Sequence, residues 1–285
     1  MRRLTYENAR GEEVEFYLSP LLIESLEGIG EVGADIQSQT APFQDGDTFI
    51  DAQLEPRFID LSGKILERNK VKIREHRQQI INVCNPKKGL GKLTLELDGS
   101  TQFIYAIPET VPTFPERSMD VWQDFEIDWF CPNPYWRSPN ETTKPLVAYT
   151  GGFTLPFTLP FTLGTLGSKT KIYNDGDVPT PVRIEIQGPT TNPQLFNRTT
   201  GTHLRINRTI NADEVMYINT EQGRQSIEVE GRDGTTSAFG FIDHDSTPLS
   251  DFLLELGENE IEHVADAGNR HAEVIIRWNS LYAGV

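Results

Sequence analysis

The stretch Val121-Trp-Gln-Asp-Phe-Glu-Ile-Asp-Trp-Phe-Cys131 decides the fold class of this chain. In its second half every other side chain is apolar, and the carboxylates Asp124, Glu126 and Asp128 fall between them. Because successive side chains of a strand point to opposite faces, the pattern predicts a strand with one buried and one solvated face. Pro132-Asn-Pro134 follows and ends the strand, since proline has no N–H for the ladder.

Toward the N-terminus the pattern changes once, from β to helix. Between Asn69 and Cys84 apolar side chains recur at helical spacing among charged residues, which predicts an amphipathic helix. Asn69 is a suitable N-cap, and Asn85-Pro86 ends the helix. Cys84 is then a small core residue rather than a reactive thiol. Two further strands are expected in this half: Arg57–Ile65, with a bulge or bend near Gly63, and Gly91–Leu97, which turns at Asp98-Gly99.

After residue 170 the sequence becomes almost uniformly β. Apolar and polar side chains alternate from Val182 to Gln187, and a last strand is expected at Ala272–Trp278. Between them, turn dipeptides such as Thr200-Gly201 and Asp233-Gly234 recur about every ten residues. This spacing is typical of a sandwich or barrel built from hairpins.

A segment without any charge, Pro145–Ser168, separates the two halves. It has the length of a membrane span, but its two internal prolines would break a transmembrane helix, so no span is expected. It contains repeats of Phe-Thr-Leu-Pro and Phe-Thr-Leu-Gly that begin at Phe153, Phe157 and Phe161. We expect an extended strap whose phenylalanines pack either between the chain's own domains or on another protein. The predicted organisation is an N-terminal domain at 1–144, a strap at 145–170 and a C-terminal domain at 171–285.

The amino-acid composition argues against several classes of function. The chain has 285 residues, enough for two domains, with 26 basic against 42 acidic side chains and a net charge of −16. So acidic a protein repels phosphate backbones, which argues against specific nucleic-acid binding. Two cysteines form no disulfide framework, and the first residues lack the apolar run of a signal peptide. We therefore expect a reduced protein assembled in the cytoplasm.

Charge is unevenly distributed. Lys64–Lys92 holds nine basic residues against two acidic ones, within an otherwise acidic half. A basic helix on an acidic body suits head-to-tail association of identical subunits. The alternative is a helix face that is merely solvated. The candidate subunit-interface residues are Lys70, Arg74, Arg77, Lys87 and Lys88 on the basic side and Asp124, Glu126 and Asp128 on the acidic side.

No motif predicts catalysis, a metal site or a cofactor. Gly164–Thr170 resembles a phosphate-binding loop, but serine precedes its lysine and a strand follows. Asp243-His-Asp-Ser246 has the residue types of a hydrolytic triad, yet neighbours in one loop rarely converge, and no Gly-x-Ser-x-Gly elbow occurs. The five histidines show no metal-binding spacing. We expect a protein that is not an enzyme, and keep a hydrolase only as a minor hypothesis.

An ordered set of segments resembles a known family along nearly the whole chain. The segments are Ala41-Pro-Phe-Gln-Asp-Gly46, Arg57–Ile65, Asn85-Pro86 with Gly91-Lys-Leu93, Cys131-Pro-Asn-Pro-Tyr-Trp-Arg137, Gly151-Gly-Phe153, Pro181–Pro189 and Trp278–Val285. Together they resemble the distal tail (Dit) proteins of siphovirus-type phages, which have long non-contractile tails.

The resemblance implies a mainly β fold of two β domains: a split-barrel-like N-terminal domain with one α-helix, and a galectin-like or jelly-roll β-sandwich at the C-terminus. It implies a structural virion protein of the tail tip that forms a hexameric ring and is assembled in the host cytoplasm. The implied partners are copies of itself, the major tail tube protein, a tail-associated baseplate or fibre protein, and the tape measure protein.

A carbohydrate-binding module that contributes to host-surface attachment is the alternative function. Sugar sites need exposed aromatic rings beside polar groups, and a lectin-like fold is not by itself evidence for one. The candidate glycan contacts in the C-terminal domain are Tyr173, Tyr217 and Trp278.

Overall fold

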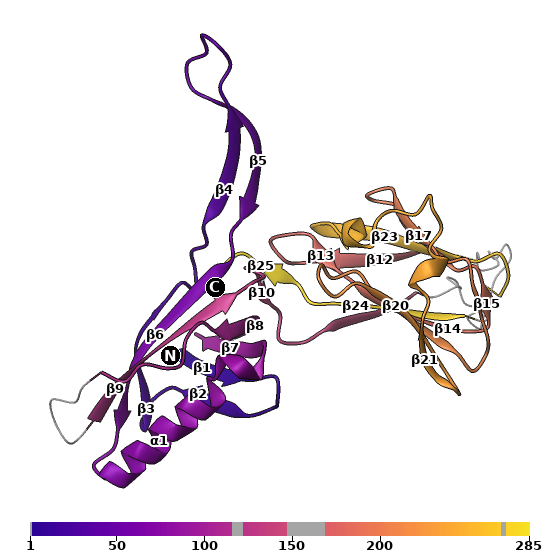
Figure 1. Ribbon diagram of the computed structural model, residues 1–285. Helices are drawn as coiled ribbons and strands as arrows, with labels where there is room; N and C mark the ends of the chain where they lie inside the picture. Colours follow the sequence, from indigo (N-terminus) through magenta and orange to yellow (C-terminus); the bar gives the residue numbers. More distant parts are fainter. Residues whose placement is uncertain (1, 116–121, 147–168, 269–271) are drawn as a thin grey trace, which may run out of the picture. The chain divides into compact units, whose positions relative to one another are not determined.

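The computed structural model describes residues 2–115, 122–146, 169–268 and 272–285, and strands dominate all four ranges (Figure 1). The chain divides into two compact units, Met1–Pro139 with Tyr282–Val285, and Asn140–Leu281. The predicted mainly β fold of two domains is confirmed. In the described residues α1 (Lys70–Val83) is the single α-helix, and no helix there is long and apolar enough to cross a bilayer.

The structure differs from the predicted domain limits at two places. Strand β11 (Thr142–Leu146) pairs with β24 (Glu273–Trp278), and Leu146 packs into the second core. Residues 140–144 therefore belong to the second unit. The last four residues belong to the first unit rather than the second. Residues 147–168 of the expected strap, with Phe153, Phe157 and Phe161, lie outside the described residues, whereas Lys169 and Thr170 belong to strand β12 (Lys169–Asn174).

The first unit is a curled antiparallel sheet whose strands follow the order β2-β1-β7-β8-β9-β6-β3. The two ends of this order meet, since Tyr17 next to β2 forms a bridge with Leu22 of β3. The sheet therefore closes into a split barrel. Its strands are β1 (Arg2–Glu7), β2 (Glu13–Phe16), β3 (Leu21–Glu27), β6 (Arg57–Leu66), β7 (Gly91–Leu97), β8 (Ser100–Pro108), β9 (Trp122–Cys131), β10 (Trp136–Arg137) and β25 (Leu281–Tyr282).

Strand β9 carries the alternation expected from its sequence. Phe125, Ile127, Trp129 and Cys131 are at most 1% exposed and lie in the barrel core. Trp129 packs against Tyr6 and Phe16 with ring centroids 5.8 and 6.3 Å apart. Such tilted aromatic pairs add about 0.5–1.5 kcal/mol each to the free energy of burial. The core of the first unit is thus built around the strand that decided the fold class.

The bulge expected near Gly63 lies on the partner strand. β6 pairs with β9 through all of its 10 residues without interruption. The register shift occurs in β3, between Ile23 and Ser25, directly opposite Gly63. A Cβ atom on Gly63 would lie 2.4 Å from the carbonyl oxygen of Leu22 and 2.5 Å from the ring of Phe125. Glycine is required here because another backbone and a core ring approach this closely.

Helix α1 begins and ends where the sequence predicts. The side chain of Asn69 accepts a hydrogen bond of 2.9 Å from the backbone N–H of Val71, and the helix ends before Cys84. Ile73, Ile80 and Cys84 are buried, as expected. Burial raises the pKa of the Cys84 thiol above its usual range, so the thiol stays protonated and unreactive. A short 3₁₀ turn, η1 (Pro86–Lys88), follows the helix.

A long hairpin of β4 (Ala34–Gln39) and β5 (Thr48–Leu54) extends far from the rest of the first unit (Figure 1). The sequence predicts no strands here, because the side chains of β4 and β5 do not alternate between a core and solvent. The register pairs Asp35 with Gln53 and Ile36 with Ala52. Two-stranded hairpins without a packed face are marginally stable in water. This element is therefore suited to packing against another surface.

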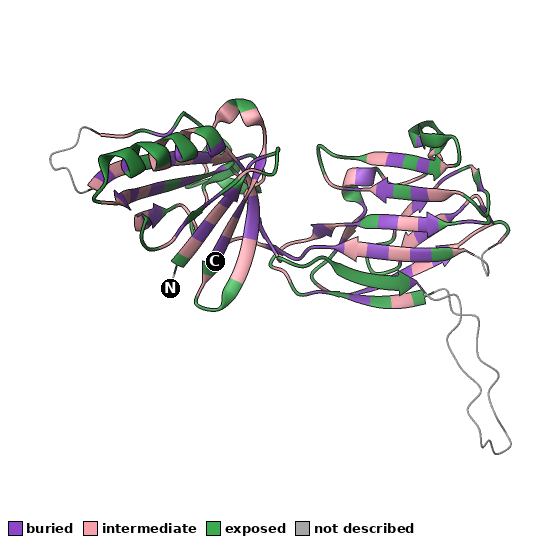
Figure 2. Cartoon of the chain, turned by 90° about the horizontal axis from the view of Figure 1, so that it is seen from below, coloured by how far each residue is buried: buried purple, intermediate pink, exposed green. Residues whose placement is uncertain are grey.

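The second unit is a β-sandwich of antiparallel sheets. A six-stranded sheet has the order β11-β24-β14-β19-β20-β21, and a four-stranded sheet the order β12-β23-β16-β17. Strands of both sheets alternate buried and exposed residues (Figure 2). The remaining bounds are β12 (Lys169–Asn174), β13 (Thr180–Pro181), β14 (Arg183–Gln187), β15 (Thr190–Thr191), β16 (Gln194–Asn197), β17 (Thr202–Arg205), β18 (Thr209–Ile210), β19 (Val215–Asn219), β20 (Ser226–Gly231), β21 (Gly234–Ser237), η2 (Phe239–Phe241), η3 (Leu249–Asp251), β22 (Leu253–Leu254) and β23 (Gly257–Val264).

One buried histidine makes the stability of the second unit depend on pH. His263 on β23 is 4% exposed, and among the described residues its Nε2 atom has no hydrogen-bond partner. Burial lowers its pKa from 6.5 to about 4. The unfolded chain therefore binds the proton first as pH falls, and stability is lost between about pH 6.5 and pH 4.

We expect this loss to reach about 3 kcal/mol at pH 4 and to be nearly absent above pH 7. His263→Leu should remove it, because leucine fills a similar volume and takes up no proton. Urea unfolding of both proteins across this pH range measures the difference. Equal pH profiles for the wild type and His263→Leu would contradict the assignment to His263.

Candidate assembly surfaces

Three of the predicted interface residues line one groove on helix α1. Lys70, Arg74 and Arg77 recur at spacings of three and four, which places them on the same face of the helix. They line a groove of about 330 Å³ together with Ile73, Gln78 and Ile81. The guanidinium of Arg77 also lies over the ring of Phe114, 4.8 Å from its centroid. We call this surface the basic groove. The groove places charged ammonium and guanidinium groups next to isoleucine side chains, so it suits a partner surface that is both acidic and apolar.

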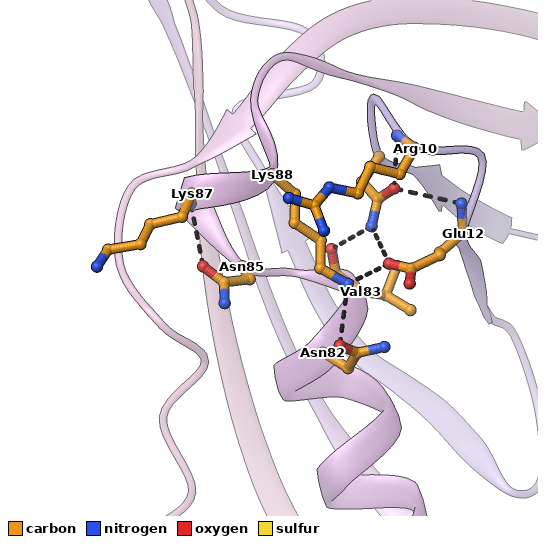
Figure 3. A network of polar contacts seen from close by, with 8 residues as sticks. Arg10, Glu12, Asn82, Val83, Asn85, Lys87 and Lys88 are labelled. Carbon is orange, nitrogen blue, oxygen red and sulfur yellow. Dashed lines mark hydrogen bonds and ion pairs between the residues drawn. The ribbon is translucent and has the colours of Figure 1, made fainter.

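Lys88 is not available for such a contact, and its prediction as an interface residue is wrong. Its side chain is 9% exposed. The ammonium group pairs with the carboxylate of Glu12 and donates a hydrogen bond of 2.9 Å to Asn82 Oδ1 (Figure 3). The side chain of Lys87 extends away from this network, while its backbone N–H donates to Asn85 Oδ1 (Figure 3).

The network around Lys88 fastens the end of α1 to the turn between β1 and β2. Asn8 is 3% exposed and donates to the carbonyl oxygen of Val83 at 3.1 Å and to Glu12 at 2.8 Å. Its own side-chain oxygen accepts from the backbone N–H groups of Arg10 and Glu12. The hydrogen bonds from Lys88 and Asn8 lower the pKa of Glu12. Lys88 thus holds the helix in place on the barrel.

The predicted carboxylates lie on the outer face of the barrel wall formed by β3, β6 and β9. Asp128 is directly opposite Asp60, and Asp60 directly opposite Glu27. Like charges directly opposite each other in a sheet repel. The pKa of the Asp60 carboxyl is raised, mainly by partial burial and to a smaller extent by the negative charges of Asp128, Glu27 and Glu109. The neighbouring Asp124 lies 3.9 Å from the ammonium group of Lys64.

We call the outer face of β3, β6 and β9, which carries these carboxylates, the acidic wall. The basic groove and the acidic wall lie on different sides of the same sheet. Ile80 and Val83 of α1 share a core cluster with Phe125 and Ile127. The helix is therefore on the side toward which these β9 side chains point, whereas Asp124, Glu126 and Asp128 point the other way. One copy presents opposite charges in different directions, which is the requirement for head-to-tail association.

The β4–β5 hairpin is a second acidic surface, and the sequence analysis did not identify it. Residues 31–56 contain six acidic side chains and no lysine or arginine. Phe43 at the tip is fully exposed, and Ile36 and Phe49 are 65% and 64% exposed. The side chains of Ser38 and Thr40 donate hydrogen bonds to the Asp47 carboxylate, and these bonds lower the pKa of Asp47. Signals in the sequence were the run without basic residues and the turn-forming Pro42 and Gly46 between the apolar residues Ile36 and Phe49.

Arg57 fixes the base of the hairpin. Its side chain is 1% exposed and donates to the carbonyl oxygens of Gly28 and Glu31, which precede β4, at 2.7 and 2.8 Å. It also donates to the carbonyl oxygens of Pro134, at 2.8 Å, and Ala283. One guanidinium thus joins the hairpin, the loop after β9 and the C-terminus of the chain. Sequence reasoning placed Arg57 in a strand but gave it no role.

Two family models match the chain in order. The phage tail protein RIFT-related domain matches residues 10–131, and the C-terminal domain of the siphovirus-type tail component matches residues 175–282. The chain belongs to the siphovirus distal tail protein (Dit) family. It is a structural component of the phage tail and baseplate hub, and so of the virion.

Solved structures share the fold of this Dit protein. The crystal structure of Dit (gp 19.1) of phage SPP1, described as a paradigm of the hub adsorption apparatus in phages that infect Gram-positive bacteria, is 12% identical with a TM-score of 0.69, over 98% of both chains. A chain from the phage P2 baseplate in its activated conformation with calcium is 11% identical with a TM-score of 0.59, over 100% of both. No curated protein matches the sequence.

The three glycan candidates of this Dit protein lie in different environments. Tyr173 and Tyr217 are 66% and 38% exposed, on the four-stranded and six-stranded sheets respectively. Trp278 is 3% exposed in the core of the sandwich. Its indole ring is covered by protein, so Trp278 as a sugar contact is wrong. The two tyrosines remain, but they are on different sheets.

The triad-like stretch of the Dit protein forms a turn. The backbone N–H of Ser246 donates to the carbonyl oxygen of Asp243, and the Ser246 hydroxyl donates to the carbonyl oxygen of Arg205. Asn207 and the backbone of Asp245 hydrogen-bond to Asp243 and lower its pKa. These contacts hold the turn against β17. Within the described ranges, no group of three or more His, Cys, Asp or Glu residues could hold a metal ion.

Proposed function

We propose that the chain forms a hexameric ring at the tail tip, which joins the tail tube to baseplate or tail-fibre proteins. The first unit would form the ring, and the second unit would contact the baseplate or fibre protein. The major tail tube protein and the tape measure protein would be neighbours of the ring. The family membership supports a hub role of this kind.

The observation that carries the proposal is a pair of complementary surfaces on one unit. The hairpin is acidic with an exposed Phe43, and the basic groove is lined by arginines and isoleucines. The hairpin and α1 lie at opposite ends of the first unit (Figure 1). A hairpin therefore cannot reach its own groove, and the two surfaces can meet only between copies. Repetition of this heterologous contact gives a ring if the rotation closes.

In the proposed contact, the hairpin tip of one copy lies in the basic groove of the next. Phe43 would pack against the partly exposed Ile81, and Asp45 would pair with Arg74 or Arg77. Removing the Phe43 side chain from water would contribute about 1.5–3 kcal/mol per contact. The charges would steer the approach and fix the register of the contact.

The test is the assembly state of the purified full-length protein at several ionic strengths. Multi-angle light scattering and electron micrographs should give rings at low salt. Association should weaken as the screening length falls from about 10 Å at 0.1 M salt to about 3 Å at 1 M. A monomer at every concentration and salt, together with the absence of the protein from purified particles, would contradict the proposal.

A further inference from the structure

The six-stranded sheet of the second unit carries a hollow that the ring proposal does not use. The hollow has a volume of about 270 Å³ and is lined mainly by β14, β19 and β24. This volume is slightly below the range of about 300–1,000 Å³ typical of pockets for drug-sized ligands. It suits a small ligand, or one unit of a longer chain. Its lining residues are Glu141, Arg183, Ile184, Glu185, Tyr217, Ile218, Asn219 and Arg277.

The charges in the hollow are paired and cancel. Arg183 and Arg277 are directly opposite each other in the sheet, where they would repel alone. Arg183 forms an ion pair of 2.8 Å with Glu141 and donates at 2.7 Å to Asn279. Arg277 forms an ion pair of 2.8 Å with Glu185. The hollow therefore carries no net charge, but it offers donors and acceptors held in fixed positions.

An aromatic ring lies beside these pairs. Tyr217 is directly opposite Glu185 on one neighbouring strand and Glu228 on the other. Its ring is 38% exposed, and it points away from the core to which Met216 and Ile218 belong. Partial burial, the charges of Glu185 and Glu230 and a hydrogen bond to Glu230 raise the pKa of its hydroxyl, so the hydroxyl stays protonated at neutral pH.

We propose that this hollow binds a neutral saccharide unit. A sugar ring has an apolar face of C–H groups, which would stack on Tyr217, and hydroxyl groups around its edge. The edge hydroxyls would accept from the arginines and donate to Glu141 and Glu185 without disturbing the ion pairs. A charged ligand would instead compete with one partner of an ion pair for its counter-charge, whereas a neutral sugar leaves both pairs intact. The balance of charge therefore favours a neutral sugar over an acidic or amino sugar.

Saturation-transfer NMR and calorimetry on the full-length protein test the proposal. The neutral probes are maltotriose, lactose and tri-N-acetylchitotriose, and the charged probes are trigalacturonate and the glucosamine trimer. At least one neutral probe should bind, and Tyr217→Ala should weaken its binding about tenfold. Tyr173→Ala removes a more exposed tyrosine from the other sheet and should leave binding unchanged. Glu185→Gln should weaken neutral probes and favour trigalacturonate, since Arg277 loses its counter-charge.

The proposal is overturned if no neutral probe binds, if Tyr217→Ala binds as the wild type does, or if charged probes bind equally well. Melting temperatures of the variants identify any that fail to fold. If Tyr217→Ala does not fold, the binding measurements on Glu185→Gln decide the proposal instead. The result is independent of the ring, because the hollow lies entirely on the second unit. Light scattering on the same samples should give the same assembly for Tyr217→Ala and the wild type.

Discussion

Replacing Arg57 by methionine is expected to lower the free energy of unfolding of the first unit by about 3–5 kcal/mol. Four carbonyl oxygens accept from this guanidinium, and the side chain is 1% exposed. Methionine keeps the apolar stem but leaves these acceptors without their donor. Each orphaned buried group costs about 1–3 kcal/mol, although some will regain water at the edge of the site.

Urea unfolding followed by tryptophan fluorescence measures this loss, since Trp129 and Trp136 are buried in the same unit. The matched control is Arg68→Met, an exposed arginine just before α1, which should change stability by less than about 0.5 kcal/mol. Arg57→Lys should lie between the two, because lysine keeps the charge but not the forked donors. If Arg57→Met were as stable as Arg68→Met, the guanidinium would not hold this junction together.

The second large effect concerns assembly. Arg74→Glu combined with Arg77→Glu should weaken self-association at least about a hundredfold, because each groove would then face an acidic hairpin with the same charge. Arg74 is exposed and Arg77 is partly exposed beside Phe114, and neither is among the buried side chains of α1, which are Ile73, Ile80 and Val83. The variant should therefore fold normally. Sedimentation velocity of wild type and variant in the same low-salt buffer measures the change.

Two further variants decide whether the hairpin is the partner of the groove. Arg68→Glu with Lys72→Glu changes the net charge equally, but neither residue lines the groove, so rings should persist. Adding Asp45→Lys and Asp51→Lys to the reversed groove should restore association, since both sides of the contact are then exchanged. If association of the reversed groove were restored by Asp60→Lys and Asp128→Lys instead, the partner of the groove would be the acidic wall of the barrel and not the hairpin.

Local pattern was sufficient to predict many elements. The alternation in β9, the helix from Asn69 to Cys84 and the turn at Asp98-Gly99 are all present. Each depends on interactions within a few residues: pleat alternation, the side-chain cap of Asn69, and the positive φ angles of 50° and 91° at the turn. Such features are encoded where they occur in the sequence.

The sites were predicted less completely. Lys88 and Lys87 are adjacent and chemically identical, but only Lys88 meets Glu12, which is remote in sequence. Trp278 shares one face of its predicted strand with Val274 and Ile276, which already pointed to the core, and the structure buries it there. The hairpin has no buried face, so periodicity could not detect it. In each case the deciding partner lies far away along the chain.

The sequence by itself determined the fold class, the helix and the charge of the α1 segment, because these follow from short-range periodicity and composition. The family resemblance came instead from an ordered set of segments along the chain. Only the tertiary structure decided which charges remain available. Folding pairs Lys88 with Glu12, brings Arg57 to four distant carbonyl oxygens and places Arg183 and Arg277 side by side with their counter-charges. These outcomes depend on strand register and on contacts between remote segments, and a local pattern contains neither.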